Sequence, residues 1–331
     1  ATAAPLLEAE EKSAPAAPTA LLPGEALHAH AQRERWWIAS YSRLLAGPAG
    51  ASAPQSAQEA NYLEEEASEP AVRVAAAPVQ GGMHAFPRGA AAGTFLHDLL
   101  EWAGREGFAA VAAEPSEWQA QIARRSRPAP WAAQEDVLRE WFGGWLHAPM
   151  ELSALVPGTA PIAPAALRSY QAEMEFWIAA QGVDASALDA LVARHTLGGQ
   201  ARPPLAPQQL NGMLKGFIDL VFEHEGRYWV ADYKSNWLGP NDAAYTAHAM
   251  RDEVLRHRYE LQYALYLFAL HRLLRARLPD YDYDRHVGGA VYVFLRGASA
   301  AGHGLHLERP PRALAEAMDR LFAGRDAEAS A

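Results

Sequence analysis

Two aspartates and a lysine in the middle of the chain have the residue types and the spacing of a divalent metal site. Residues 216–235 contain two runs of strand-forming residues separated by Glu225-Gly226, which predicts a β-hairpin. Counting outward from this turn places Asp219 directly opposite Asp232. Lys234 projects on the same side as Asp232, because side chains alternate along a strand. We therefore expect a cation between two carboxylates, with a lysine at its edge.

The alternative to a metal site is a solvated face that carries acids and a surface ion pair. Opposed residues of a hairpin have Cβ atoms about 5 Å apart, so two carboxylates repel unless one is protonated or a cation lies between them. The adjacent lysine favours the cation. Apolar residues fill both arms of the hairpin and predict burial, which makes unpaired charges there costly. They are Phe217, Ile218, Leu220, Val221, Phe222, Trp229 and Val230.

The elements around the hairpin are predicted to be mostly helical. Apolar residues recur with helical spacing in residues 93–103. Residues 286–296 read as a second buried strand, and residues 36–45 as a short strand or the start of a helix. Further helices are expected over residues 134–147, 165–179, 184–194, 242–256, 259–277 and 312–322. The pattern predicts an α/β fold, with a small mixed sheet flanked by helices and a large helical portion.

The chain is expected to divide into one folded domain and two terminal segments. Residues 1–33 are rich in Ala and Pro and read as a linker. The folded domain is placed at residues 34–325, with a surface loop over residues 47–78, and residues 326–331 form a tail. The first residue is Ala rather than Met, which is compatible with a fragment of a longer polypeptide.

Composition excludes several classes of function. The chain of 331 residues has no cysteine, which excludes disulfides, thiolate nucleophiles, zinc–thiolate sites and iron–sulfur clusters. This composition is compatible with a reducing compartment, and we expect a cytoplasmic protein without a membrane-spanning segment. The net charge of −10 argues against strong independent binding of DNA. No phosphate-binding loop of the ATPase type occurs, so no ATPase activity is expected.

Four stretches of the sequence resemble one family of nucleases. Residues 213–222, 231–239, 258–266 and 286–297 are similar to the nuclease domain of the RecB family, the beta subunits of exodeoxyribonuclease V. The resemblance extends from about residue 36 to residue 324 and is specific within residues 211–297. That family belongs to the restriction-endonuclease-like nucleases, the PD-(D/E)xK superfamily, and the resemblance implies their fold.

The resemblance assigns roles to the hairpin residues and adds a histidine. Asp219 and Asp232 match the two acids of the family motif, and Lys234 matches its lysine. His97 matches the histidine of a Gly-x-x-x-His pattern that contributes to metal binding, although a lone helical histidine is more often a packing or surface residue. The family also uses a backbone carbonyl, here that of Tyr233. The implied cofactor is Mg²⁺, with Mn²⁺ as a substitute and Ca²⁺ as an inhibitor.

Two further motifs of the family have counterparts here. Glu173 resembles an intermediate acid of the family, with Glu175 as the competing register, and both could instead be ordinary exposed acids. Gln262 and Tyr266 fit a Gln-x-x-x-Tyr signature and share a helical face, from which they reach DNA or brace the lysine. Packing of the tyrosines is the alternative.

The implied function is Mg²⁺-dependent hydrolysis of DNA phosphodiester bonds during double-strand break repair and recombination. The resemblance implies an exonuclease whose substrate is a single strand delivered by a helicase, with the helicase domain on the same polypeptide and RecC-like and RecD-like partner subunits. One alternative is a catalytically silent docking module of such a complex. Another is a carboxylate-pair hydrolase such as a glycosidase, which would work in the presence of a chelator and have no use for Lys234.

Overall fold

The computed structural model describes residues 37–46 and 79–324. The predicted linker at residues 1–33, the predicted loop at 47–78 and the tail at 326–331 lie outside the described residues. Six strands form one mixed sheet in the described part of the chain. They are β1 (Trp37–Ala39), β2 (Ser169–Asp184), β3 (Gln209–His224), β4 (Arg227–Lys234), β5 (Val287–Phe294) and β6 (Leu305–Glu308).

Strand β3 organises the sheet. It pairs along one edge with β2, antiparallel, over nearly its whole length. Its other edge is shared by β1, parallel, near the start and by β4, antiparallel, near the end. Beyond β4 the sheet continues with β5, parallel, and β6, antiparallel. The predicted small mixed sheet flanked by helices is therefore confirmed.

The predicted hairpin is confirmed in its turn and its register. His224 pairs with Arg227, and Glu225 and Gly226 both have positive φ angles, 52° and 75°. Two positive φ angles in a two-residue loop are the geometry that matches the twist of hairpin strands. The first arm is longer than predicted, because β3 begins at Gln209.

The helix predicted over residues 165–179 is wrong, because residues 169–184 form strand β2. The segment contains good helix formers, but apolar and acidic residues alternate from residue 172 to residue 176, and exposed and buried residues alternate from 175 to 180. Period-two alternation is the signature of a strand. Pairing with β3 along this length overrides the local helix propensity.

The other predicted helices are present; those at 259–277 and 312–322 have the predicted bounds, and the rest have shifted ends. Residues 36–45 contain both predicted elements, since β1 is followed directly by a helix, and the predicted helix at 242–256 begins only at Ala247. Two helices between residues 108 and 126 were not predicted. The α-helices are α2 (Tyr41–Ala46), α4 (Ala90–Glu106), α5 (Phe108–Ala113), α6 (Pro115–Ser126), α7 (Glu135–His147), α8 (Ala185–His195), α9 (Ala247–Arg256), α10 (Tyr259–Arg277), α11 (Tyr283–His286) and α12 (Arg312–Phe322).

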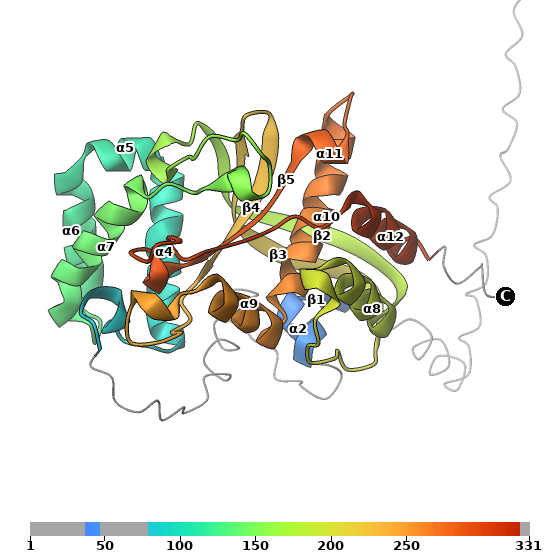
Figure 1. The fold of residues 1–331 in the computed structure, drawn as a ribbon, viewed down its shortest axis with the longest axis horizontal. Helices are drawn as coiled ribbons and strands as arrows, with labels where there is room; N and C mark the ends of the chain where they lie inside the picture. The colour runs from blue at the N-terminus through green and yellow to red at the C-terminus, as the bar shows by residue number, and fades with distance from the viewer. Residues whose placement is uncertain (1–36, 47–78, 325–331) are drawn as a thin grey trace, which may run out of the picture. The chain divides into compact units, whose positions relative to one another are not determined.

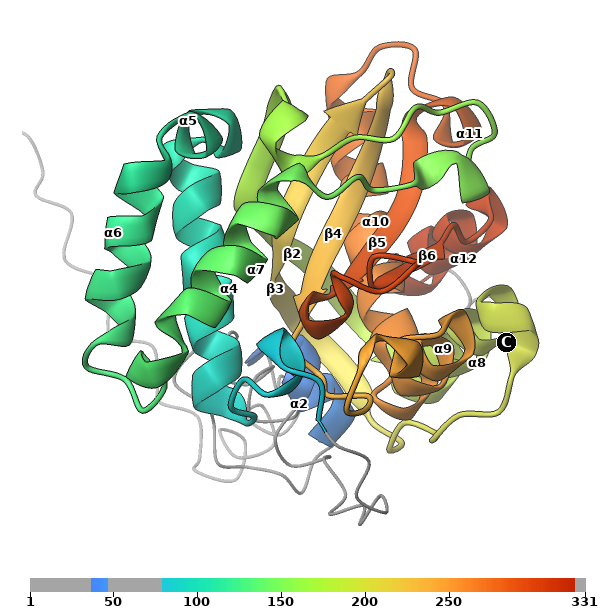
Figure 2. The same ribbon diagram turned by 60° about the vertical axis from the view of Figure 1, so that its left-hand side comes forward.

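Helices cover the sheet on both faces, and each face has its own core. Helices α4 to α7 gather on one side of the strands, whereas α8, α10 and α12 lie on the other (Figures 1 and 2). Apolar side chains of β4 and β5 alternate between the two cores: Trp229 and Val291 pack with α4 and α7, and Val230 and Ala290 pack with α10. No helix within residues 37–46 and 79–324 is long and apolar enough to cross a membrane.

Candidate active site

Three carboxylates lie in a row across three neighbouring strands. The β2–β3 ladder pairs Ala172 with Leu220 and Met174 with Ile218, so Glu173 on β2 faces Asp219 on β3. The β3–β4 ladder pairs Leu220 with Ala231, and the next position outward holds Asp219 and Asp232. The sheet register alone therefore aligns Glu173, Asp219 and Asp232.

The hairpin forks at this row. The paired residues of β3 and β4 end at Leu220 and Ala231, one step before the position that the sequence places as Asp219 opposite Asp232. Beyond the fork, β4 pairs only with β5 among the described strands, up to Lys234 opposite Phe294. The Asp219 carboxylate accepts a hydrogen bond from the backbone N–H of Tyr233 at 2.7 Å. A side-chain oxygen of β3 thus replaces the backbone oxygen that the Tyr233 amide would bind if the β3–β4 ladder continued.

The β2–β3 ribbon rotates at the same place. Leu220 packs in the core beside α4, yet Ile218, two residues earlier on β3, packs in the core beside α10. Across the ladder, Glu173 has a φ angle of +50°, a left-handed conformation that costs energy in any residue with a side chain. The surrounding structure holds this acid in an unfavourable backbone conformation.

Burial and mutual repulsion raise the pKa of two of the carboxyl groups into the neutral range or above it. Burial and the charge of Asp219 raise the pKa of Asp232 to about 7, although Lys234 opposes the rise. Burial, followed by the charges of Asp219 and Glu101, raises the pKa of Glu173 to about 8. The row therefore has more potential negative charge than its surroundings stabilise, and either protons or a cation must compensate for it.

Lys234 is buried together with Asp232. Its ammonium nitrogen is 2.8 Å from Oδ2 of Asp232, and both side chains are 3% exposed. The same nitrogen lies 3.9 Å from the centroid of the Tyr259 ring and 5.5 Å from that of Tyr292. The alternative of a surface ion pair is therefore excluded. Aromatic faces and a carboxylate together fix the direction of the ammonium group.

Helix α4 adds a histidine and a further acid. His97 is buried, and its Nδ1 lies 3.5 Å from Oδ2 of Asp219. Glu101, one helical turn later, contributes to the raised pKa of Glu173. The sequence indicated His97 but missed Glu101, which the four-residue spacing could have revealed. The helix approaches the sheet closely at Gly104, where an added Cβ would lie 2.8 Å from the Cβ of Ala172.

The donor types in this cluster fit a hard divalent cation. Carboxylate oxygens from the row and an imidazole nitrogen from His97 are ligands that suit Mg²⁺ and Mn²⁺. Within the described ranges, no three His, Asp or Glu side chains are already arranged closely enough to hold an ion. The cluster fits a cation because it contains more acidic groups than its surroundings can stabilise as anions. Tyr233, whose carbonyl is the remaining expected ligand, is held by its hydrogen bond to Asp219 and by ring contacts with His97 and Trp145.

Glu173, rather than Glu175, lies beside the other acids. Glu175 is on the same edge of the ribbon but 43% exposed, and it forms an ion pair with Lys215 at 3.4 Å. It also accepts a hydrogen bond from the indole N–H of Trp177. Of the two registers that the sequence left open, the structure places only Glu173 against Asp219.

Gln262 and Tyr266 lie on one face of α10, as their spacing predicted, and both are buried. The hydroxyl of Tyr292 donates to the Gln262 side-chain oxygen at 2.8 Å, and the Gln262 amide donates to the Tyr266 hydroxyl at 3.0 Å. Burial and the charges of Asp232 and Asp219 raise the pKa of Tyr266 well above its ordinary value. These residues connect α10 to β5 beneath the acids, which favours bracing over contact with DNA.

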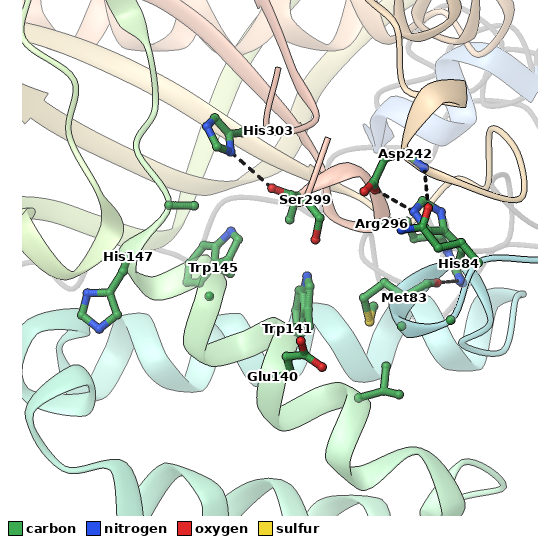
Figure 3. A pocket seen from close by; sticks show the side chains of 17 residues that line it. Met83, His84, Glu140, Trp141, Trp145, His147, Asp242, Arg296, Ser299 and His303 are labelled. Atoms are coloured by element: carbon green, nitrogen blue, oxygen red, sulfur yellow. Dashed lines mark hydrogen bonds and ion pairs between the residues drawn. The ribbon is translucent and has the colours of Figure 1, made fainter. Parts of the chain in front are cut away.

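A cavity of about 560 Å³ lies elsewhere, between α7 and the segments around residues 80–84 and 296–303. Figure 3 shows its polar lining, which includes His147, His303 and the ion pair of His84 with Asp242 at 2.8 Å. None of the predicted site residues lines it. Trp145 contributes to its wall and contacts the ring of Tyr233. We therefore place the candidate site at the acid row, on chemical grounds, and not in this cavity.

Comparison with known proteins identifies the family. A model of the PD-(D/E)XK nuclease superfamily matches residues 72–329. The chain is 42% identical over 248 residues to the RecBCD enzyme subunit RecB of Escherichia coli (strain K12), covering 74% of this chain and 20% of that protein. It is 33% identical over 351 residues to the same subunit of Mycobacterium tuberculosis (strain H37Rv), covering 91% and 30%. It is 37% identical over 190 residues to the same subunit of Haemophilus influenzae, covering 56% of this chain and 15% of that protein. The chain thus spans less than a third of each relative.

Proposed function

Because the chain belongs to the PD-(D/E)XK nuclease superfamily, we propose that it is a Mg²⁺-dependent nuclease domain acting on single strands of DNA. The observation that carries this proposal is the row of Glu173, Asp219 and Asp232, of which Asp232 is fully buried, with the Lys234 ammonium 2.8 Å from Asp232. Acids that cluster in this way retain protons near neutral pH, and a divalent cation can replace those protons.

The residues of the row divide the work of hydrolysis. Asp219 and Asp232 hold the cation through oxygen, with His97 and the carbonyl of Tyr233 as the other protein ligands. A bound divalent cation polarises a phosphoryl oxygen and lowers the pKa of a bound water. Lys234 positions the attacking water and offsets charge on the phosphate. For this role its ammonium group is already directed at Asp232 by the rings of Tyr259 and Tyr292.

Glu173 is proposed as the third acid of the site. Its pKa of about 8 means that it holds a proton near neutral pH, where an ordinary glutamate is ionised. A carboxyl with such a pKa can donate a proton to the leaving oxygen or accept one from water. The left-handed backbone at this residue keeps the group beside Asp219.

The partners proposed are those that the relatives' names imply. These relatives are subunits of a RecBCD enzyme, so we propose RecC-like and RecD-like subunits and a helicase domain on the same polypeptide. The function of the whole is then exonucleolytic processing of DNA ends in repair and recombination. A net charge of −10 suits a domain to which the strand is delivered, because such a domain need not attract DNA by itself.

The test is cleavage of linear single-stranded DNA by the purified chain in Mg²⁺ and in EDTA. The variants are Asp232→Asn and Lys234→Ala, and the matched control is Asp136→Asn, whose side chain on α7 is almost fully exposed. We expect cleavage by the unaltered chain and by the control in Mg²⁺ only. Both site variants should lose at least a hundredfold in rate, the scale of one general acid or base.

The outcomes separate the alternatives. Normal cleavage by Lys234→Ala in Mg²⁺ contradicts the proposed mechanism. Cleavage that persists in EDTA contradicts a metal-dependent nuclease. If the unaltered chain remains inactive after RecC-like and RecD-like subunits and the helicase are added, the domain is a docking module and the proposal fails.

A further inference from the structure

The β2–β3 ribbon has an open face that begins at the acid row. From residue 173 to 179 on β2, and from 213 to 219 on β3, odd-numbered residues are partly or fully exposed and even-numbered residues are mostly buried. Residues that pair across the ladder share a face. The open face therefore consists of three cross-strand pairs, Glu175–Phe217, Trp177–Lys215 and Ala179–Met213, and it begins at Glu173 and Asp219, which lie between two neighbouring pairs of the ladder.

This face presents aromatic rings around a cation. Trp177 is 44% exposed, which is unusual for so large an apolar side chain. The Lys215 ammonium nitrogen lies 4.9 Å from the centroid of the Trp177 ring and 5.0 Å from that of Phe217. Glu175 fixes this group from one side, by pairing with Lys215 and accepting the indole N–H of Trp177. The rings are thus held in place before any ligand arrives.

The open face extends along the strands from the candidate active site. Two residues of a strand advance by about 7 Å. Phe217 is therefore one such step from Asp219, and the Trp177–Lys215 pair is two steps away. At the far end, Ile38 of β1 lies beside Met213 and is 59% exposed, which extends the apolar surface. Strand β4 pairs with β3 only from Leu220 to His224, so it does not flank this part of the ribbon.

We propose that this face is a base-stacking track for single-stranded DNA, in which Trp177 and Phe217 stack bases and Lys215 contacts a phosphate. The inference rests on the proposed function in taking DNA as the ligand. Every base has a flat apolar face, so aromatic platforms bind single strands without regard to sequence. A processive nuclease needs that tolerance, because each nucleotide in turn must occupy the position beside the acids.

The combination of exposed aromatic rings with an ammonium group favours a nucleic acid over an apolar protein partner. Lys215 is the cation of the track, and its pairing with Glu175 is partly solvent-exposed and therefore weak. An incoming phosphate can compete for the ammonium group while the rings take up the bases. A second copy of this chain would have to bury the Lys215–Glu175 pair, which is unfavourable.

The test measures binding in EDTA, so that it does not depend on cleavage. Fluorescence anisotropy at low salt compares an oligothymidylate with an abasic oligonucleotide of the same length. The full chain is used unaltered and as Trp177→Ala, Phe217→Ala and Lys215→Ala. Leu273→Ala is the matched control, because Leu273 is an exposed large apolar residue on α10, outside the track.

We expect the unaltered chain to prefer the oligothymidylate. Each aromatic variant should lose about tenfold in affinity for it, the effect of one stacked base, and lose nothing for the abasic strand. Lys215→Ala should weaken binding of both strands equally and reduce the salt dependence. Leu273→Ala should bind as the unaltered chain does, and thermal melting of every variant checks that it folds.

The inference is overturned if the unaltered chain does not distinguish the two strands, binds neither, or keeps its preference in both aromatic variants. Analytical ultracentrifugation compares the mass of the unaltered chain with that of the aromatic variants. If the unaltered chain is a dimer and the variants are monomers, while the preference for the oligothymidylate is unchanged, the face binds a second copy and the inference is also overturned. If Mg²⁺-dependent cleavage occurs but the preference does not depend on the aromatic residues, only the track fails. If the preference is lost as expected but no cleavage is found with all partners, only the nuclease proposal fails.

Discussion

The carboxylate of Asp219 accepts a hydrogen bond from the backbone N–H of Tyr233 at 2.7 Å, just beyond the point where β3 and β4 stop pairing. One side chain therefore has two tasks. It stabilises the fork of the hairpin, and it brings a carboxylate to the opening that the fork creates. The tasks require different chemistry, because the hydrogen bond needs an acceptor whereas a cation needs charge.

Substitution of Asp219 should separate these tasks. Asp219→Asn retains an oxygen acceptor for the Tyr233 amide, so we expect stability within about 1 kcal/mol of the unaltered chain and cleavage reduced at least a hundredfold. Asp219→Ala leaves that amide without its partner and should cost a further 1–3 kcal/mol or so. Urea denaturation and the cleavage assay measure the two effects. Equal destabilisation by Asn and Ala would contradict the proposed acceptor role.

Glu173 and Glu175 provide a matched pair on one strand. Glu173→Gln removes the carboxyl with the raised pKa, and we expect the cleavage rate to fall by at least about tenfold. Glu175→Gln removes a mostly exposed charge, so stability should change by less than about 0.5 kcal/mol and the rate by less than threefold. Cleavage rates at pH 7.5 in Mg²⁺ decide between them. A larger loss of rate in Glu175→Gln than in Glu173→Gln would show that Glu175 is the functional acid and would contradict the role proposed for Glu173.

The sequence predicted those parts of the site that depend on local geometry. The turn at Glu225-Gly226 sets the register of the hairpin, and counting from it brings Asp219 next to Asp232. The four-residue spacing of Gln262 and Tyr266 likewise placed them on one face of α10. In both cases a short stretch of regular backbone carries the information.

Features that depend on long-range pairing were not predictable in this way. Strand β2 was expected to be a helix, so the position of Glu173 opposite Asp219 was not foreseen. The left-handed backbone at Glu173 has no counterpart in residue preferences, since glutamate rarely adopts it. Glu101 joins the cluster only because α4 packs against β2 at Gly104. Each of these depends on a contact between residues far apart in the chain.

Without a metal, the acid row should destabilise the protein as pH rises. In the folded chain the pKa of Asp232 is about 7, above its ordinary 3.8, so folding retains a proton that the unfolded chain releases. The unfolding free energy should then fall between about pH 4 and pH 7, by up to about 4 kcal/mol for this group. Asp232→Asn should remove that part of the slope, as measured by urea denaturation in EDTA.

Addition of Mg²⁺ should oppose this loss, because the cation replaces the protons of the row. We expect the melting temperature to rise with Mg²⁺ more at pH 8 than at pH 5.5, and Asp232→Asn to show a smaller rise. The control is Asp136→Asn, which should respond as the unaltered chain does. A Mg²⁺ effect that is equal at both pH values would contradict metal binding linked to these carboxyl groups.

Gln262 should act as a positioning residue. Gln262→Leu leaves the hydroxyls of Tyr292 and Tyr266 without their shared partner, which should cost about 1–3 kcal/mol of stability. If the chain of hydrogen bonds also braces the ring that lies against Lys234, kcat should fall while KM stays unchanged. Tyr266→Phe removes one link and should show a smaller effect that is not additive with Gln262→Leu. An unchanged kcat in a stable Gln262→Leu variant would leave Gln262 with a packing role only.

His306 on β6 should give the opposite pH dependence from the acid row. Burial, with a smaller contribution from Arg251, lowers its pKa from 6.5 to about 4, and its Nε2 has no hydrogen-bond partner among the described residues. The unfolded chain therefore binds a proton that the folded chain rejects between pH 6.5 and pH 4. Stability is lost as pH falls through this range, by about 3 kcal/mol at pH 4 for this group alone.

His306→Gln does not titrate, so it isolates this contribution from the acids that also change charge in the same range. We expect the unfolding free energy of the unaltered chain to fall relative to that of His306→Gln as pH decreases from 7 to 4. His303→Gln is the matched control, since His303 is partly exposed and lies on the neighbouring loop. Parallel pH profiles for the unaltered chain and His306→Gln would show that the histidine is charged or solvated in the folded protein.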